Sequence, residues 1–250
     1  MGHFIRQHRA VGFFSSFNII VASLKFIYDN KIDNFFIDWK NPLYQTDEKN
    51  LFDTYFYKQS PLTKIEYTYD ATEMGCIYSS TFDKTLLLEL NNILKIYGHM
   101  DNAIYKKCKE DCIKIENCLG VHVRGTDHWQ HGELLDTEYY FKKIDEKLNL
   151  KSYQNILLIT DENKNIEIFK NRYGSMIHTN NNIFRSSNET AIHYSNFSNL
   201  DKLVRDVMID AISLSMCDEI LVTSSNVSAY TLMLNPTIKF EQIDLHVQYH

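Results

Sequence analysis

Several features that would point to a fibrous, secreted or membrane-spanning chain are scarce in this sequence. The 250 residues include only 3 prolines and 8 glycines, so no long flexible linker is expected. The longest apolar run, 11–27, is interrupted by Ser, Asn and Lys and is short for a bilayer span. Five cysteines are present without a secretory signal before them, which favours free thiols in an intracellular, cytoplasmic protein.

Positive charge is not in excess, and this excludes a sequence-independent grip on nucleic acid. The chain carries 26 Lys and Arg against 32 Asp and Glu, a net charge of −6. A protein that holds nucleic acid through its phosphates needs a broad basic face. A local basic pocket for one small phosphate ligand remains compatible with this balance.

The cysteines do not predict a metal site. Cys108, Cys112 and Cys118 fit no standard zinc pair, and no fourth ligand follows at motif distance. We therefore expect no bound metal and interpret these residues as small buried or surface thiols.

Strands and helices alternate in the second half, which predicts a doubly wound parallel sheet covered on both faces. The expected strands are 118–124, 156–160, 175–178 and 219–223, and the expected helices are 136–148, 163–173, 200–216 and 227–234. The first half has a smaller α/β pattern, with a helix at 19–28, a strand at 34–39, mostly irregular chain at 45–82, and helices at 85–100 and 102–116. We expect two domains, residues 1–115 and 116–250.

Polar side chains follow three of the strands expected in the second half. They are His122, Arg124 and Asp127 after the first, Thr160 and Asp161 at the second, and Thr223, Ser224, Ser225 and Asn226 after the last. Ligands of open α/β sheets lie outside the carboxyl ends of the strands, so one pocket is expected to gather all three groups.

Arg124 and His122 are the strongest candidates at these strand ends. They stand two residues apart on a strand and so share one face, and an arginine can fork two hydrogen bonds onto a phosphate. Asp127 and Glu133 follow within ten residues and are candidates to accept a proton. The alternative is a surface arginine paired with Asp127 or Glu133.

Three further features have a functional and a structural interpretation. Ser224–Asn226 precedes a helix, where free amides bind anions, or it simply caps that helix. Asp210 lies in an apolar helix and needs donors if it is buried, or it lies on an exposed helix face. The loop from Gly12 through Phe14 lets backbone approach a ligand, or it is a plain turn before a helix.

The motif Gly120-Val-His-Val-Arg-Gly-Thr-Asp127 resembles the His-x-Arg-x-x-Asp signature of GDP-fucose-dependent fucosyltransferases. That superfamily includes α1,6-fucosyltransferases, a nodulation fucosyltransferase and protein O-fucosyltransferases. Leu157–Asp161 resembles its second motif. Asp210 through Asn226 resembles its third motif. The order and approximate separation of all three agree over roughly 118–236.

The resemblance implies a GT-B arrangement, in which two Rossmann-like domains face each other across a cleft. It implies that Arg124 holds the diphosphate, that His122 and Asp210 read the guanine, and that Asp161, Ser224, Ser225 and Asn226 add contacts. Gly12 and Phe14 fall where the family has a glycine loop. The implied reaction is an inverting, metal-independent transfer from GDP-fucose, with no cofactor, to a glycan hydroxyl, with Glu133 or Asp127 as the base.

Two departures from the α1,6 pattern leave alternatives open. Gly125 stands where those enzymes have a second arginine, and His128 stands where they have a lysine. Both positions border the sugar and the acceptor in the family. The alternatives are a glycosyltransferase of the same fold that uses another nucleotide sugar and a nucleotide- or sugar-binding module without catalysis. The acceptor itself is not readable, although Trp129 lies next to the motif and its ring could stack on a sugar.

Overall fold

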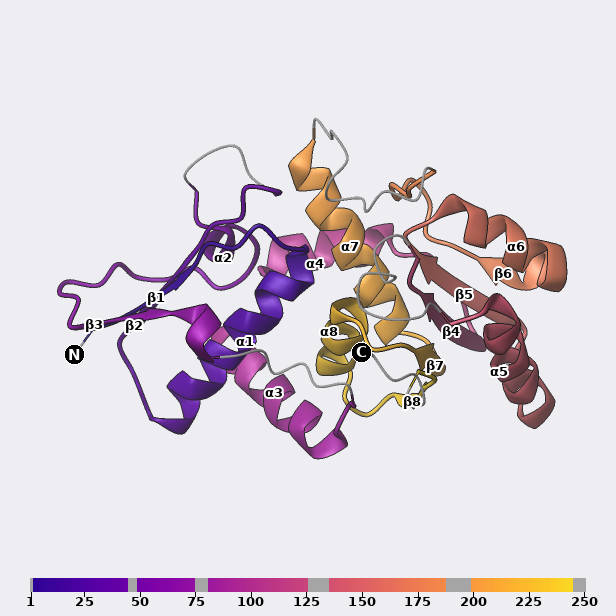
Figure 1. The fold of residues 1–250 in the computed structure, drawn as a ribbon, viewed down its shortest axis with the longest axis horizontal. Coiled ribbons are helices and arrows are strands. Elements are labelled where there is room, and N and C mark those ends of the chain that lie inside the picture. The colour runs from indigo at the N-terminus through magenta and orange to yellow at the C-terminus, as the bar shows by residue number, and fades with distance from the viewer. Residues whose placement is uncertain (1, 45–48, 75–80, 126–134, 188–198, 245–250) are drawn as a thin grey trace.

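The computed structural model describes residues 2–44, 49–74, 81–125, 135–187 and 199–244. Two parallel sheets lie at opposite ends of the molecule, and a group of helices fills the space between them (Figure 1). In the first half, β1 (His3–Gln7) is the centre of a three-stranded sheet with the order β2-β1-β3. Its other strands are β2 (Phe35–Trp39) and β3 (Tyr67–Asp70).

Only β2 of this first sheet was predicted, by the apolar run at 34–39. In β1, Ile5 and Gln7 are buried, and β3 is largely exposed, so neither strand has the apolar alternation that marks a half-buried strand. The helices of this half are α1 (Phe13–Asp29), α2 (Leu51–Tyr55), the 3-10 turn η1 (Ala71–Met74), α3 (Lys84–Tyr97) and α4 (Asn102–Asp111).

The second half is the doubly wound sheet that the sequence predicts. Its five parallel strands have the order β6-β5-β4-β7-β8, with β4 in the centre. They are β4 (Cys118–Val123), β5 (Asn155–Thr160), β6 (Ile177–His178), β7 (Glu219–Val222) and β8 (Lys239–Gln242). The last of these was not predicted, because its sequence Lys-Phe-Glu-Gln offers a single apolar side chain.

Helices cover both faces of this five-stranded sheet. On one face, α5 (Thr137–Leu150) and α6 (Asn163–Tyr173) contribute to an apolar cluster with Leu119, Val121 and Leu158. On the other face, α7 (Leu200–Ser215) and α8 (Asn226–Leu234) share a cluster with alternate strand residues such as Ile159 and Ile220. A short 3-10 turn, η3 (Gly174–Met176), follows α6.

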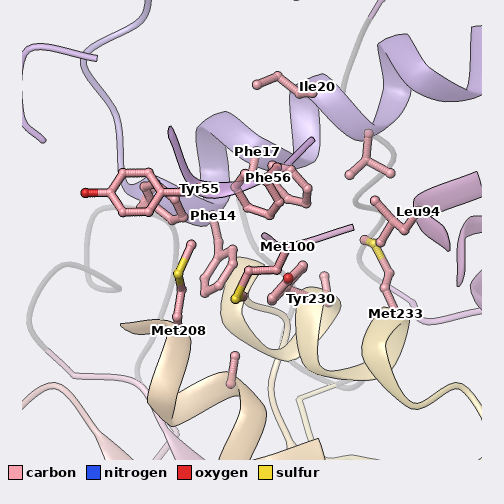
Figure 2. Packing of buried hydrophobic residues seen from close by; sticks show 14 of the residues in the cluster. Phe14, Phe17, Ile20, Tyr55, Phe56, Leu94, Met100, Met208, Tyr230 and Met233 are labelled. Atoms are coloured by element: carbon pink, nitrogen blue, oxygen red, sulfur yellow. The ribbon is translucent and has the colours of Figure 1, made fainter. Parts of the chain in front are cut away.

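One apolar cluster joins the two halves of the chain. Its members include residues of α1 and α3 in the first half and of α7 and α8 in the second (Figure 2). Cys108 of α4 belongs to the same cluster. The ring of Phe14 stacks on Tyr230 with centroids 4.3 Å apart, and Phe17 lies edge-on to the same tyrosine at 5.4 Å. The boundary expected near residue 115 falls between α4 and β4, and the apolar core crosses it. The division into two domains stays a prediction.

Four of the cysteines, Cys108, Cys112, Cys118 and Cys217, are free thiols, as expected. Burial raises the pKa of the Cys108 thiol to about 11, so this sulfur is a poor nucleophile near neutral pH. Separately, none of the helices in the described part of the chain is long and apolar enough to cross a bilayer.

The shared cluster predicts that the halves unfold together. Phe14→Ala removes a side chain that is 2 % exposed and is expected to cost about 3–5 kcal/mol of unfolding free energy in a single cooperative transition. The measurement is urea unfolding followed by circular dichroism and by tyrosine and tryptophan fluorescence. Ile168→Ala, on the outer face of α6 at 38 % exposure, is the control and should change stability by about 0.5 kcal/mol or less. Two separate transitions would contradict the shared core.

Candidate functional site

The strand order places the three polar strand ends side by side. Strand β4 lies between β5 and β7, and all three run parallel, so their carboxyl ends meet at one edge of the sheet. The residues at this edge are His122–Gly125 at the end of β4, Asp161 and Glu162 after β5, and Thr223–Asn226 after β7. We call this edge, together with the first turn of α8, the β4 edge.

His122 is held by the first turn of α8. Its Nδ1 lies 2.8 Å from the Ser228 hydroxyl and 3.2 Å from the Ser225 hydroxyl. Ser225 is also the N-cap of α8, where its Oγ accepts a hydrogen bond from the Ser228 backbone N–H at 3.0 Å. The capping role expected for this segment and its place at the β4 edge therefore hold together.

Arg124 is half-buried directly after β4. Two acidic residues, Asp161 and Glu162, contact the next residue, Gly125. Asp161 accepts a hydrogen bond from the Gly125 N–H at 2.9 Å, and its carbonyl oxygen accepts one from the Ser186 N–H at 2.7 Å. Asp161 thus ties the turn after β4 to the segment that follows β6. The Asp161 side chain makes the first of these contacts and its backbone makes the second, and its expected contact with a ligand stays a prediction.

Glu162 explains why residue 125 is a glycine. A Cβ atom added at Gly125 would overlap the Glu162 carboxylate. That carboxylate is buried, accepts a hydrogen bond from Asn165 Nδ2 at 3.2 Å, and lies 3.5 Å from the Lys164 ammonium. A negative charge therefore occupies the space beside Gly125. Sequence reasoning missed Glu162, although a glycine directly after the motif arginine was a signal of close packing.

Asp210 is buried and paired with an arginine that the sequence did not single out. Arg185 donates from its two terminal nitrogens to the two Asp210 oxygens, at 3.1 and 3.3 Å, and it also bonds the Thr160 carbonyl oxygen at the end of β5. Asn180 donates to Asp210 at 2.8 Å. The exposed-face alternative for Asp210 is wrong, because its residue exposure is 7 %. The donors that a buried carboxylate needs come from inside the protein.

The start of α8 is tied to β8 and to α1. The Ser224 N–H donates to Asp244 at 2.5 Å, and Gln242 Nε2 donates to the Ser224 hydroxyl at 2.7 Å. Asn226 Oδ1 accepts a hydrogen bond from Asn18 of α1 at 2.8 Å. Asp244, only 1 % exposed, and Gln242 are further residues of this edge that the sequence did not predict.

The loop with Gly12 and Phe14 leads into α1, and the aromatic side chain of Phe14 does not line the β4 edge. Gly12 is the N-cap of α1, and its φ of −50° does not require a glycine. Phe14 was expected to line the ligand site, but its ring is buried in the core against Tyr230. Its side chain therefore stabilises the fold, because an apolar ring gains more from the shared cluster than from a polar edge.

Two expected catalytic residues cannot be placed. Asp127 and Glu133 lie outside the described residues, as do His128 and Trp129. Among the residues that are described, no group of three or more His, Cys, Asp or Glu side chains is arranged to hold a metal ion.

Comparison with known proteins reveals the fold. No family model matches the chain, and no curated protein matches its sequence. Solved structures do match: the fucosyltransferase NodZ from Bradyrhizobium has a TM-score of 0.58 at 12 % identity, with 98 % of this chain and 97 % of that chain covered. POFUT1 in complex with GDP-fucose has a TM-score of 0.54 at 9 % identity, with 97 % and 98 % covered.

A third match is NodZ alpha-1,6-fucosyltransferase co-crystallised with GDP, with a TM-score of 0.58, 13 % identity, and 98 % and 97 % of the two chains covered. At identities this low the likeness establishes the fold. The chain has the mixed α/β fold with parallel sheets of these GT-B fucosyltransferases, as expected from the sequence.

The contact between Gly125 and Glu162 predicts that substitutions at these two positions have non-additive effects on stability. Gly125→Ala is expected to cost about 1–3 kcal/mol of stability, because the new methyl group has no space beside the carboxylate. Combining it with Glu162→Ala should recover part of this loss, giving a coupling energy of about 0.5–3 kcal/mol in urea unfolding. Gly12→Ala is the matched control: no atom lies within 4 Å of its added Cβ, so we expect a change of about 0.5 kcal/mol or less. Additive losses would contradict the overlap.

Because the Arg185–Asp210 pair is buried, breaking it is expected to cost more stability than breaking a surface ion pair. Arg185→Met leaves the Asp210 carboxylate buried without its cation and is expected to cost about 3–5 kcal/mol. The control is Arg205→Met, which breaks a surface pair with Asp201 at 2.7 Å, with side-chain exposures of 27 % and 54 %. That substitution should cost about 1 kcal/mol or less in the same unfolding assay. Equal costs would show that the first pair is not desolvated.

Proposed function

We propose that this protein is an inverting glycosyltransferase that transfers fucose from GDP-fucose to a hydroxyl group of a glycan acceptor. The supporting observation is the β4 edge: His122 and Arg124 at the end of the central strand, beside the N-terminus of α8. NodZ co-crystallised with GDP and POFUT1 in complex with GDP-fucose share this fold. The order of the three sequence motifs agrees with the proposal.

In the proposed reaction, the bond between the sugar anomeric carbon and the diphosphate oxygen breaks as the acceptor oxygen attacks from the opposite face. Negative charge then builds on the leaving GDP, and Arg124 stabilises it with two forked hydrogen bonds. The N-terminus of α8, where Ser224, Ser225 and Asn226 lie, adds the partial positive charge of the helix dipole beside the diphosphate. We propose that these groups do the work that a metal ion does in other transferases.

His122 and Asp210 are proposed to recognise the guanine base. The N7 and O6 atoms of guanine accept hydrogen bonds, which suits an imidazole N–H, and its N2 amine donates them, which suits a carboxylate. Asp161 supports this recognition from the turn after β5. The proton that the acceptor hydroxyl loses is assigned to the carboxylate of Glu133 or Asp127.

One observation favours a nucleotide sugar whose nucleobase is not guanine. Asp210 already accepts hydrogen bonds from Arg185 and Asn180 on both of its oxygens. A base that offers no donor pair to this carboxylate would leave that buried network intact. The second candidate is therefore a transferase of the same fold that uses another nucleotide sugar.

The test is nucleotide binding by calorimetry, followed by turnover of a panel of nucleotide sugars in the presence of a chelator. We expect GDP to bind with micromolar affinity. Arg124→Ala should bind GDP about tenfold to 150-fold more weakly and abolish transfer, because hydrogen bonds to a charged group are worth about 1.5–3 kcal/mol.

The matched control is Arg172→Ala, which removes a surface arginine paired with Asp145 on the outer side of α5 and should leave binding unchanged. Absence of any heat with GDP would overturn the proposal. Turnover of a UDP- or ADP-sugar without GDP-fucose turnover would favour the second candidate. GDP binding without turnover of any donor would leave a binding module.

A further inference from the structure

Ser228 is a fully buried hydroxyl that the proposed reaction does not use. It lies in the first turn of α8 at 0 % exposure, and sequence reasoning assigned it no role. Its Oγ is 2.8 Å from His122 Nδ1 and 3.0 Å from Ser225 Oγ, while Ser225 Oγ is 3.2 Å from the same ring nitrogen. The three side chains form a closed triangle, and His122 is itself only 5 % exposed.

Counting hydrogens shows how this triangle is best satisfied. Two hydroxyl hydrogens are available, and Ser225 Oγ already accepts one hydrogen bond from the Ser228 N–H. If Ser225 donates to Ser228 and Ser228 donates to Nδ1, both hydrogens are used inside the triangle and the shortest contact ends on a nitrogen lone pair. If Nδ1 carried a proton instead, one hydroxyl hydrogen would have to find an acceptor outside the triangle.

The helix N-terminus favours the same arrangement. Ser225 is the N-cap of α8, so the free backbone N–H groups of the first turn create a positive potential around His122 Nδ1. A lone pair on Nδ1 is stabilised in this potential, and an N–H dipole pointing toward it is destabilised. Both arguments place the imidazole proton on the other ring nitrogen.

We infer that Ser228 is a positioning residue that holds His122 in the tautomer with its proton on Nε2. Its use rests on the proposed function: an Nε2–H group can only donate to a nucleotide, so it selects a base edge with acceptors, such as N7 and O6 of guanine. The exocyclic amine of adenine is a donor and would oppose this N–H. Ser228 thus acts on base recognition through His122, without touching the nucleotide.

The experiment measures the tautomer directly in the free protein. Long-range proton–nitrogen correlation spectra of protein labelled with 15N-histidine distinguish a protonated ring nitrogen from a bare one. The His122 signals are identified among the 10 histidines by their loss in His122→Asn. We expect a bare Nδ1 and a protonated Nε2 in the native chain, and a shift toward Nδ1 protonation in Ser228→Ala.

Thr231→Val is the matched control because it removes another fully buried hydroxyl of α8. The Thr231 hydroxyl bonds the Ala211 carbonyl oxygen at 3.3 Å and does not contact His122, so this variant should keep the native tautomer. A protonated Nδ1 in the native chain would overturn the inference, whether or not the variants fold. An unchanged tautomer in folded Ser228→Ala would overturn it as well.

A parallel GDP titration separates this inference from the proposed function. Ser228→Ala is expected to bind GDP about threefold to tenfold more weakly, the size of one misaligned neutral hydrogen bond, while Thr231→Val binds as the native chain does. If the native chain does not bind GDP, the proposed function fails and the tautomer spectra still decide the role of Ser228. If Ser228→Ala has the altered tautomer but binds GDP as tightly as the native chain, Ser228 sets the tautomer without affecting base recognition. Only the link to base recognition is then overturned.

Discussion

The structure depends on the burial of the middle of α8. Six consecutive residues, from Ser228 to Met233, are buried, because α7, α3 and α1 all pack against this helix. A helix enclosed in this way must find a partner for each polar group inside the protein. Ser228 bonds His122, and Thr231 bonds the backbone of α7. These bonds fix the N-terminus of α8 against the end of β4, where the candidate site is built.

The polar groups of the β4 edge and of the residues around it are largely paired within the protein. Arg185 neutralises Asp210, Asp161 accepts from the Gly125 amide, and Asp244 accepts from the Ser224 amide. Such pairing holds charged groups in place before any ligand arrives, which is what electrostatic preorganisation requires. It also sets a limit, because a nucleotide gains from these groups only where it adds a bond or replaces one. The Ser224 amide shows this limit most clearly, because it already donates a hydrogen bond to the buried Asp244 carboxylate.

The sequence predicted the second half of the fold better than the first. Strands β4, β5 and β7 are apolar runs followed by polar residues, so both their type and the edge where they meet could be predicted. Strands β1, β3 and β8 are partly polar, and their pairing depends on contacts distant in sequence. The same reason hid Arg185, Asp244 and Glu162, whose roles come from partners on other elements. Phe14 was assigned to the ligand because a loop pattern cannot reveal that a helix places its ring in the core.

The ring stack between Phe14 and Tyr230 bears on how a ligand could enter and leave. Many enzymes built from two sheets facing a gap admit substrate by swinging one half on a hinge. Here such a swing would separate two buried aromatic rings and break the hydrogen bond between Asn18 and Asn226. Exposing that contact to water would carry a large hydrophobic penalty each time the two halves separated. If the chain acts as proposed, its ligand is therefore better admitted without separating the halves at this contact.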